Sequence, residues 1–152
     1  MSNYQKLLNY YKECFDLVDC FHFNSETAGN VFKRYLPTCK GKVVSITHNG
    51  IKDHRQHKDF HQNVLHIGFI GNSTLYKGLP LLISTLESIG KSDSWDLAIW
   101  GGGVGKHSSL PIYYKGKFDA STIADVYKAM DVLVVPSIWK ETFSLVTLEA
   151  LS

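Results

Sequence analysis

Short apolar runs alternate with segments of helical periodicity along most of this 152-residue chain. The clearest apolar runs are VLHIGFIGN at 64–72, WDLAIW at 95–100 and DVLVVP at 131–136. Each run is largely apolar throughout, whereas a strand with one face in water would alternate apolar and polar residues. The pattern therefore predicts an α/β fold in which helices cover both faces of a parallel sheet.

Helix and strand signals elsewhere complete this alternation. The expected helices are one at 78–89 that ends at Gly90, one from a Ser25 cap to about Tyr35, one from an Asp119 or Ser121 cap through Met130, and one that starts near Ser144. Further strands are expected at 17–24, 42–46 and 112–115, and residues 3–15 have a loose helical period. The two ends break the pattern, because the last helix has no stop signal and residues 1–16 precede a strand without a partner unit. We therefore expect a fragment that is cut at both ends.

Charge and cysteine usage limit the function classes. A net charge of +2 is too small for a dedicated nucleic-acid binder. The three cysteines form no CxxC pair and favour a reducing compartment. The N-terminus lacks the apolar core of a signal peptide, and no run of eighteen apolar residues could span a membrane. We expect a cytoplasmic protein without a nucleic-acid partner.

Two glutamates follow the strand at 131–136. Glu141 lies in the expected turn and Glu149 in the expected last helix, among apolar neighbours. Open α/β sheets bind ligands at the carboxyl ends of their strands, and carboxylates accept hydrogen bonds from sugar hydroxyls. The alternative interpretation is two surface glutamates near a helix start, which the helix dipole would favour for Glu141. The apolar context favours a sugar-nucleotide site.

Lys77 lies in the loop that follows the strand at 64–72. The helix after it opens at Gly78-Leu79-Pro80, with proline in the first turn. Backbone N–H groups of that turn, together with the lysine, could hold a diphosphate. An exposed lysine in an ordinary loop is the alternative.

The glycine run at 101–105 and the histidines at 54, 57 and 61 are weaker signals. The glycine run matches neither GxGxxG nor the P-loop, so it indicates a flexible turn or a close backbone approach to a ligand. The histidines have helical spacing next to Asp53 and Asp59, but the segment is polar on all sides. We expect a solvated loop there and no metal site.

Taken in order, several motifs resemble one known family. They are FNSETAGNVFKRY, ITHNGI, GNSTLYKG, DLAIWGGG, YYKGKF, IADVYKAMDVLVVPS and the two-glutamate motif KETFSLVTLEAL. Together they resemble the C-terminal, donor-binding domain of the group 1 (family 4) retaining glycosyltransferases. The resemblance implies a Rossmann-like sheet that forms the truncated C-terminal half of a GT-B fold. It also implies that residues 1–16 are a tail or linker from a missing N-terminal domain, and that 17–152 is a nucleotide-sugar-binding domain that is incomplete at its C-terminus.

The resemblance assigns roles to individual residues. By it, Lys77 would bind the donor diphosphate, Glu149 would bind the ribose hydroxyls, and Glu141 would lie beside the transferred sugar. Glu141 and Lys77 would be the catalytic residues. The other implied donor-binding residues are Asn72, Gly102, Lys117, Phe118, Phe143, Ser144 and Leu145. Two of these depart from the family pattern, because Asn72 replaces an arginine and Ser144 replaces a glycine. The chain also ends before the family's next Gly-x-Pro-Val strand.

The function that follows from the resemblance is transfer of a sugar, with retention, from a UDP-, GDP- or ADP-linked donor, without a cofactor or metal. The acceptor would be a glycan or a lipid-linked glycan held by the missing domain, as in cell-envelope polysaccharide synthesis, and we expect the isolated fragment to be inactive. Peripheral association of the full-length enzyme with the inner membrane face is a further expectation. Two alternatives stay open: a non-catalytic Rossmann-like fragment with weak nucleotide binding, and a GT-B-fold sugar epimerase.

Overall fold

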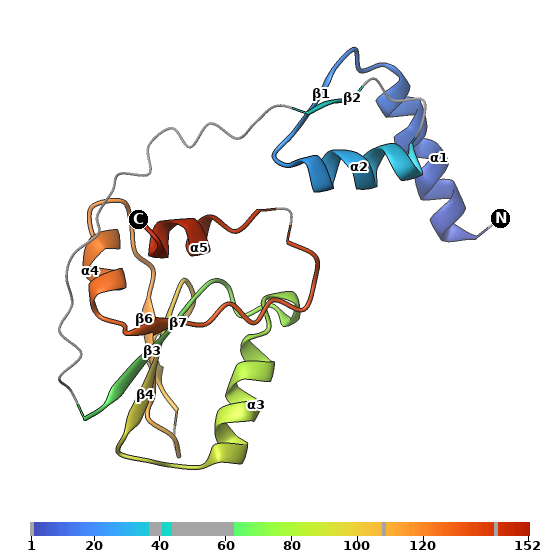
Figure 1. The fold of residues 1–152 in the computed structure, drawn as a ribbon. Coiled ribbons are helices and arrows are strands. Elements are labelled where there is room, and N and C mark those ends of the chain that lie inside the picture. Colours follow the sequence, from blue (N-terminus) through green and yellow to red (C-terminus); the bar gives the residue numbers. More distant parts are fainter. Residues whose placement is uncertain (1, 37–40, 44–62, 108, 142) are drawn as a thin grey trace. The chain divides into compact units, whose positions relative to one another are not determined.

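The computed structural model describes residues 2–36, 41–43, 63–107, 109–141 and 143–152. The chain forms two compact units, Met1–Gly50 and Ile51–Ser152, and each is described here by itself (Figure 1). The expected division into 1–16 and 17–152 stays a prediction. The histidine segment, with His54, His57 and His61, lies outside the described residues.

The smaller unit contains two helices and a two-stranded parallel sheet. Its elements are α1 (Asn3–Asp16), β1 (Phe21–Phe23), α2 (Glu26–Tyr35) and β2 (Gly41–Val43). Ser25 caps α2 as predicted, because its hydroxyl accepts the Ala28 N–H at 3.1 Å. Phe15, Phe21 and Phe32 contact one another through their rings and join the elements. The strand is shorter than the predicted 17–24, because residues 17–20 lie in the turn after α1.

The larger unit is built on a five-stranded sheet. Its strands are β3 (Leu65–Ile70), β4 (Trp95–Trp100), β5 (Gly105–Lys106), β6 (Ile112–Gly116) and β7 (Val132–Leu133), in the order β5-β6-β4-β3-β7. All neighbours pair in parallel except β5, which runs antiparallel to β6. The helices are α3 (Leu79–Ile89), α4 (Ile123–Lys128) and α5 (Leu145–Ala150), with a short 3₁₀ turn, η1 (Leu75–Lys77).

The order of the parallel strands creates a switch point. From β3 the chain adds β4 and then β6 on one side, and it crosses back to add β7 on the other side. This is the order of a Rossmann-like half sheet, and the crevice at the carboxyl ends of the two strands that flank the reversal is where such sheets bind ligands. The loops that follow β3 and β7 therefore border the expected site.

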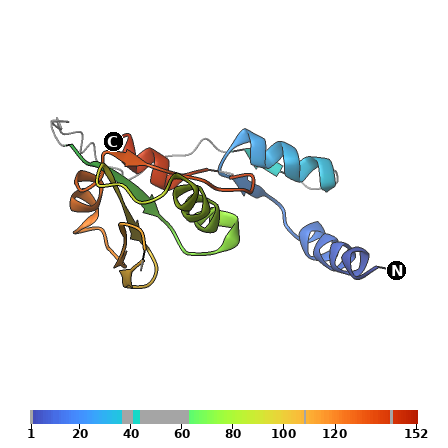
Figure 2. The ribbon, with the colours of Figure 1, turned by 90° about the horizontal axis from the view of Figure 1, so that it is seen from below.

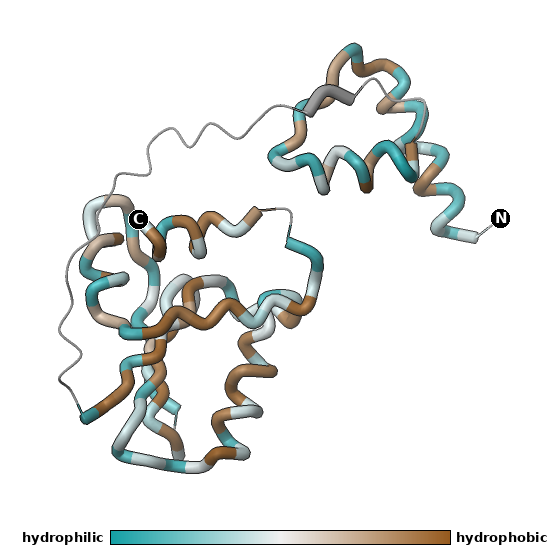
Figure 3. Tube along the Cα trace, in the orientation of Figure 1, coloured by the Kyte–Doolittle hydropathy of each residue, from teal (hydrophilic) through white to brown (hydrophobic). Residues whose placement is uncertain are grey.

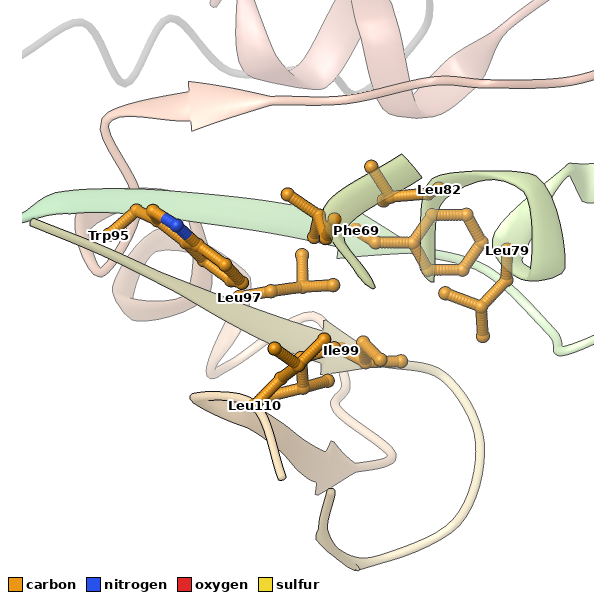
Figure 4. Close-up of a cluster of buried hydrophobic side chains, with 9 residues drawn as sticks. Phe69, Leu79, Leu82, Trp95, Leu97, Ile99 and Leu110 are labelled. Atoms are coloured by element: carbon orange, nitrogen blue, oxygen red, sulfur yellow. The ribbon is translucent and has the colours of Figure 1, made fainter. Parts of the chain in front are cut away.

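Apolar side chains cover the sheet on both faces, which confirms the predicted fold class. Strand β4 directs Leu97 and Ile99 toward α3, in a cluster with Phe69, Leu79 and Leu82 (Figure 4). The alternate residues of β4, Ala98 and Trp100, pack with Val126 and Met130 on the α4 side. Figure 2 shows α3 and α4 on opposite sides of the strands, and Figure 3 shows the apolar stretches in β3, β4 and α3. Because both faces are buried, the strand sequences are largely apolar, with His66 and Asp96 as the polar exceptions in β3 and β4.

Several predicted boundaries of the larger unit were wrong. Strand β7 has two residues instead of the predicted 131–136, and η1 and β5 were not predicted. Helix α4 has its N-cap at Thr122 rather than at Asp119 or Ser121, and it ends at Lys128. The cause is a local turn, because the Asp119 carboxylate accepts the N–H groups of Ser121 and Thr122 at 2.8 and 3.3 Å before the helix begins.

Candidate active site at the switch point

Gly78 brings the loops after β3 and β7 together. It ends η1 and precedes α3 in a left-handed conformation, with φ +75°. A Cβ atom at this position would overlap the backbone carbonyl of Pro136, in the loop after β7. Only glycine allows this approach together with the left-handed backbone. The close contact places Lys77, the residue before it, against the second loop.

Lys77 and Glu141 form an ion pair across the two loops. The Lys77 Nζ lies 2.7 Å from the Glu141 Oε1, and the Ser137 hydroxyl donates to the same oxygen at 2.7 Å. The Lys77 and Glu141 side chains are 37% and 23% exposed, so the pair is accessible to a ligand. The Ile138 N–H donates to the Tyr76 carbonyl at 3.0 Å and fixes the same two loops. Sequence reasoning singled out both charged residues but predicted neither their pairing nor Ser137.

The environment of Glu141 keeps it ionised. The hydrogen bond from Lys77, followed by that from Ser137, lowers the pKa of Glu141 below its usual value. An ionised carboxylate accepts hydrogen bonds and stabilises positive charge, and it does not donate a proton. The site therefore offers one cation and one anion side by side.

A small pocket lies beside this pair. It is lined by Phe69, Ile70, Lys77, Val135, Pro136, Ser137, Glu141, Ser144 and Val146. The structure thus brings three of the predicted residues, Lys77, Glu141 and Ser144, to one cavity. The neighbours of Ser144 in the predicted set, Phe143 and Leu145, are half-buried and 58% exposed, respectively.

Ser144 caps the last helix. Its hydroxyl accepts the Thr147 N–H at 3.3 Å and the Thr147 hydroxyl at 2.8 Å, and α5 begins at the next residue as predicted. Its φ of −102° is ordinary for any residue, so a serine fits here without strain.

Glu149 lies on α5 and is held from α4. The Tyr127 hydroxyl donates to the Glu149 Oε2 at 2.9 Å and also approaches the Val146 carbonyl at 3.2 Å. Burial, and then the bond to Glu149, raise the pKa of the Tyr127 hydroxyl, so it stays a donor. Glu149 is outside the residues that line the pocket. Sequence reasoning missed Tyr127, although a tyrosine on the buried side of a predicted helix is a signal for a polar partner.

The remaining predicted donor-binding residues lie in loops at the same end of the sheet. Asn72 is exposed, and its Oδ1 accepts the Thr74 hydroxyl at 2.6 Å. Lys117 is exposed after β6, whereas Phe118 packs against the α4-side cluster. A Cβ atom at Gly102 would meet no protein atom within 4 Å. Internal packing therefore does not require glycine at this position.

The described residues contain neither a candidate metal centre nor a membrane-spanning helix. Among them, no group of three or more histidine, cysteine or acidic residues is arranged to hold a metal ion. In the same part of the chain, no helix is long and apolar enough to cross a membrane.

A family model described as "Glycosyl transferases group 1" matches residues 64–152, which is more than half of the chain and includes the whole described sheet of the larger unit. No curated protein matches the chain.

Proposed function

The chain belongs to the group 1 glycosyl transferases, and on this premise we propose that its larger unit binds a nucleotide-sugar donor at the switch point. The family implies transfer of a sugar from a donor to an acceptor. The observation that carries the donor assignment is the Lys77–Glu141 pair, which joins the two loops that border the reversal of strand order. A diphosphate-linked sugar presents anionic oxygens and hydroxyls, and the pair can bind both.

Lys77 would bind the donor diphosphate. Its ammonium is partly exposed, and its carboxylate partner can turn toward a sugar hydroxyl when phosphate oxygens replace it. In transfer, negative charge develops on the leaving diphosphate, and a fixed ammonium stabilises this charge. Lys77 is therefore proposed as a catalytic residue through electrostatic stabilisation.

Glu141 would lie beside the transferred sugar as an ionised acceptor. Its lowered pKa makes a general-acid role unfavourable at neutral pH. It can instead hold a sugar hydroxyl and stabilise positive charge that develops on the sugar ring. Transfer with retention, without a bound metal, is part of this proposal.

Glu149 would bind the ribose hydroxyls of the nucleotide. The Tyr127 hydroxyl donates to one of its oxygens, and a carboxylate can accept further hydrogen bonds at both oxygens. Asn72, Gly102 and the backbone from Phe143 to Leu145 would contact phosphate and sugar. Lys117 and Phe118 would lie near the base. The open space at Gly102 is compatible with a close approach of the ligand.

One observation favours a second candidate, a non-catalytic fragment that binds nucleotide weakly. Both Lys77 and Glu149 already have protein partners, so a ligand must compete with those contacts. The sugar epimerase has no such observation in its favour. Three further properties are proposed at the level of the family. They are the sugar donor, a glycan or lipid-linked acceptor, and a cytoplasmic location with peripheral membrane contact.

Calorimetric titration with UDP, GDP and ADP tests the donor site. We expect one of these nucleotides to bind the parent chain, and Lys77→Ala to weaken that binding about tenfold or more. Lys91→Ala is the matched control, because Lys91 is an exposed lysine in the turn after α3. Equal affinity of the parent chain and the Lys77 variant would contradict the assignment. No binding of any of the three nucleotides would favour the non-catalytic candidate.

A further inference from the structure

Two aromatic rings lie exposed beside the Lys77–Glu141 pair. Tyr76 comes from η1 and Trp139 from the loop after β7, with side chains that are 63% and 56% exposed. Their ring centroids are 6.3 Å apart, with the planes tilted by 40°. The adjacent residues Leu75 and Ile138 are 63% and 55% exposed and extend the apolar surface.

Hydrogen bonds join the two loops that carry the rings. The Ile138 N–H donates to the Tyr76 carbonyl. Lys77 follows Tyr76 in the first loop, and Trp139 follows Ile138 in the second. The indole N–H of Trp139 is among the groups that lower the pKa of Glu141. Trp139 as a whole remains more than half exposed to solvent.

Folding of the larger unit does not account for this exposure. The other two tryptophans, Trp95 and Trp100, are each only 7% exposed and pack in the two clusters that cover the sheet. A large aromatic side chain in water contributes little to the stability of the unit, because the hydrophobic gain depends on area removed from water. Tyr76 and Trp139 are also absent from the lining of the pocket.

The chemistry of the surface fits a saccharide ring. A pyranose has one face of C–H groups, which packs on the electron-rich face of an aromatic ring, and an edge of hydroxyls, which needs charged or polar partners. Trp139 and Tyr76 supply the aromatic faces, and Glu141 and Lys77 supply the polar partners one or two positions away in the sequence. Binding to a membrane surface would require a cluster of free cations. Here the carboxylate of Glu141 offsets Lys77, and the exposed Lys140 next to Trp139 is a single further cation and not a cluster.

We propose that Tyr76 and Trp139 form an aromatic platform that stacks against a pyranose ring of the acceptor saccharide. The assignment to the acceptor, rather than to the donor sugar, rests on the proposed function, in which the donor occupies the pocket that neither ring lines. The platform would hold the acceptor next to the Glu141 carboxylate and the Lys77 ammonium, where the sugar passes from the donor diphosphate to an acceptor hydroxyl. It would place part of acceptor recognition in the unit that binds the donor.

Indole N–H signals in a ¹H–¹⁵N NMR spectrum test the platform, because the chain has three tryptophans and Trp139 is the exposed one. The probes are methyl glucoside, methyl galactoside and N-acetylglucosamine, each titrated without nucleotide. We expect at least one to shift the Trp139 signal saturably and to leave the signals of Trp95 and Trp100 in place. Trp139→Phe assigns the signal, and its saccharide binding is then followed by the backbone signals of neighbouring residues.

Variants separate stacking from a general surface effect. We expect Trp139→Ala to abolish saturable binding, Trp139→Phe to retain it, and Tyr76→Ala to weaken it about threefold to tenfold. Tyr35→Ala is the control, because Tyr35 is 62% exposed and lies in the smaller unit. Equal binding by Trp139→Ala and the parent chain would overturn the proposal. So would self-association that Trp139→Ala removes without any saccharide response.

A parallel titration with nucleotides distinguishes failure of this proposal from failure of the donor-site assignment. If UDP, GDP and ADP fail to bind while a free saccharide still shifts Trp139, the donor assignment fails and the platform stands. If a nucleotide binds through Lys77 but no free saccharide shifts Trp139, the platform fails and the donor site stands. A Trp139 shift seen only with a nucleotide-linked sugar, and not with free saccharides, would overturn the assignment to the acceptor.

Discussion

Replacement of Gly78 by alanine should be far more damaging than the same change at another glycine with positive φ. Gly78 has φ +75°, and its added Cβ would overlap the Pro136 carbonyl. Gly103 has φ +54°, and its nearest neighbour to an added Cβ is a Tyr114 ring carbon at 3.8 Å, which is ordinary contact. Both variants carry the left-handed cost, about 1–2 kcal/mol. Only Gly78→Ala also forces a backbone segment away.

The additional cost for Gly78 can be bounded from overpacking. Forcing an atom into a well-packed region costs about 1–3 kcal/mol, and a backbone carbonyl cannot move aside as a flexible side chain does. We therefore expect Gly78→Ala to lower the free energy of unfolding by about 2–5 kcal/mol in total. Gly103→Ala should lower it by about 1–2 kcal/mol.

Urea unfolding followed by tryptophan fluorescence is the appropriate assay. All three tryptophans, at positions 95, 100 and 139, lie in the larger unit, so the smaller unit does not enter the signal. Loss of the close contact should also separate Lys77 from Glu141, and nucleotide affinity should fall in the same variant. If Gly78→Ala and Gly103→Ala have the same unfolding free energy, the close approach of the two loops is wrong.

Three further predictions concern the contacts around the site. Tyr127→Phe removes the hydroxyl that holds Glu149, so nucleotide affinity should fall up to about tenfold and stability by about 1 kcal/mol; unchanged calorimetric affinity would refute a positioning role. The pKa of Glu141 is lowered by Lys77, so its contribution to stability is present above its ordinary pKa and is lost as pH falls through the lowered pKa. The stability difference between the parent and Glu141→Gln in urea unfolding should therefore be at most about 1 kcal/mol near pH 7 and should shrink as the pH falls below the ordinary glutamate pKa. A difference that does not depend on pH would contradict this prediction. Gly102→Ala should leave the urea midpoint unchanged, because a Cβ there meets nothing within 4 Å, but it should weaken nucleotide binding; a large loss of stability with normal binding would reverse that assignment.

The parts of the fold that sequence predicted best are those with uniform burial. Strand β4 was predicted with its observed bounds, because both of its faces are covered and all of its residues except Asp96 belong to an apolar run. Helix α3 was predicted because Leu79, Leu82 and Leu86 lie along one buried stripe and Gly90 follows its end. Strand β7 pairs only with β3 through Val132 and Leu133, so an apolar run of six residues overstated its length.

The site was predicted as residues but not as contacts. Lys77 and Glu141 are 64 positions apart, and their pairing depends on the reversal of strand order and on the approach at Gly78. Neither leaves a periodic pattern in the sequence. The bond between Tyr127 and Glu149 likewise joins two helices across 22 positions. Spacing rules describe neighbours along one helix or strand, so they do not predict contacts between different loops or between different helices.

The central claim, that Lys77 binds the diphosphate of a nucleotide, is tested most directly by a comparison of nucleoside di- and monophosphates. The measurement is the calorimetric affinity of the parent chain and of Lys77→Ala for the best-binding nucleoside diphosphate and for its monophosphate. Because Lys77 must give up part of its contact with Glu141, we expect the variant to lose about tenfold in diphosphate affinity and almost nothing for the monophosphate. An equal loss for both nucleotides, or no loss for either, would contradict the contact between Lys77 and the diphosphate.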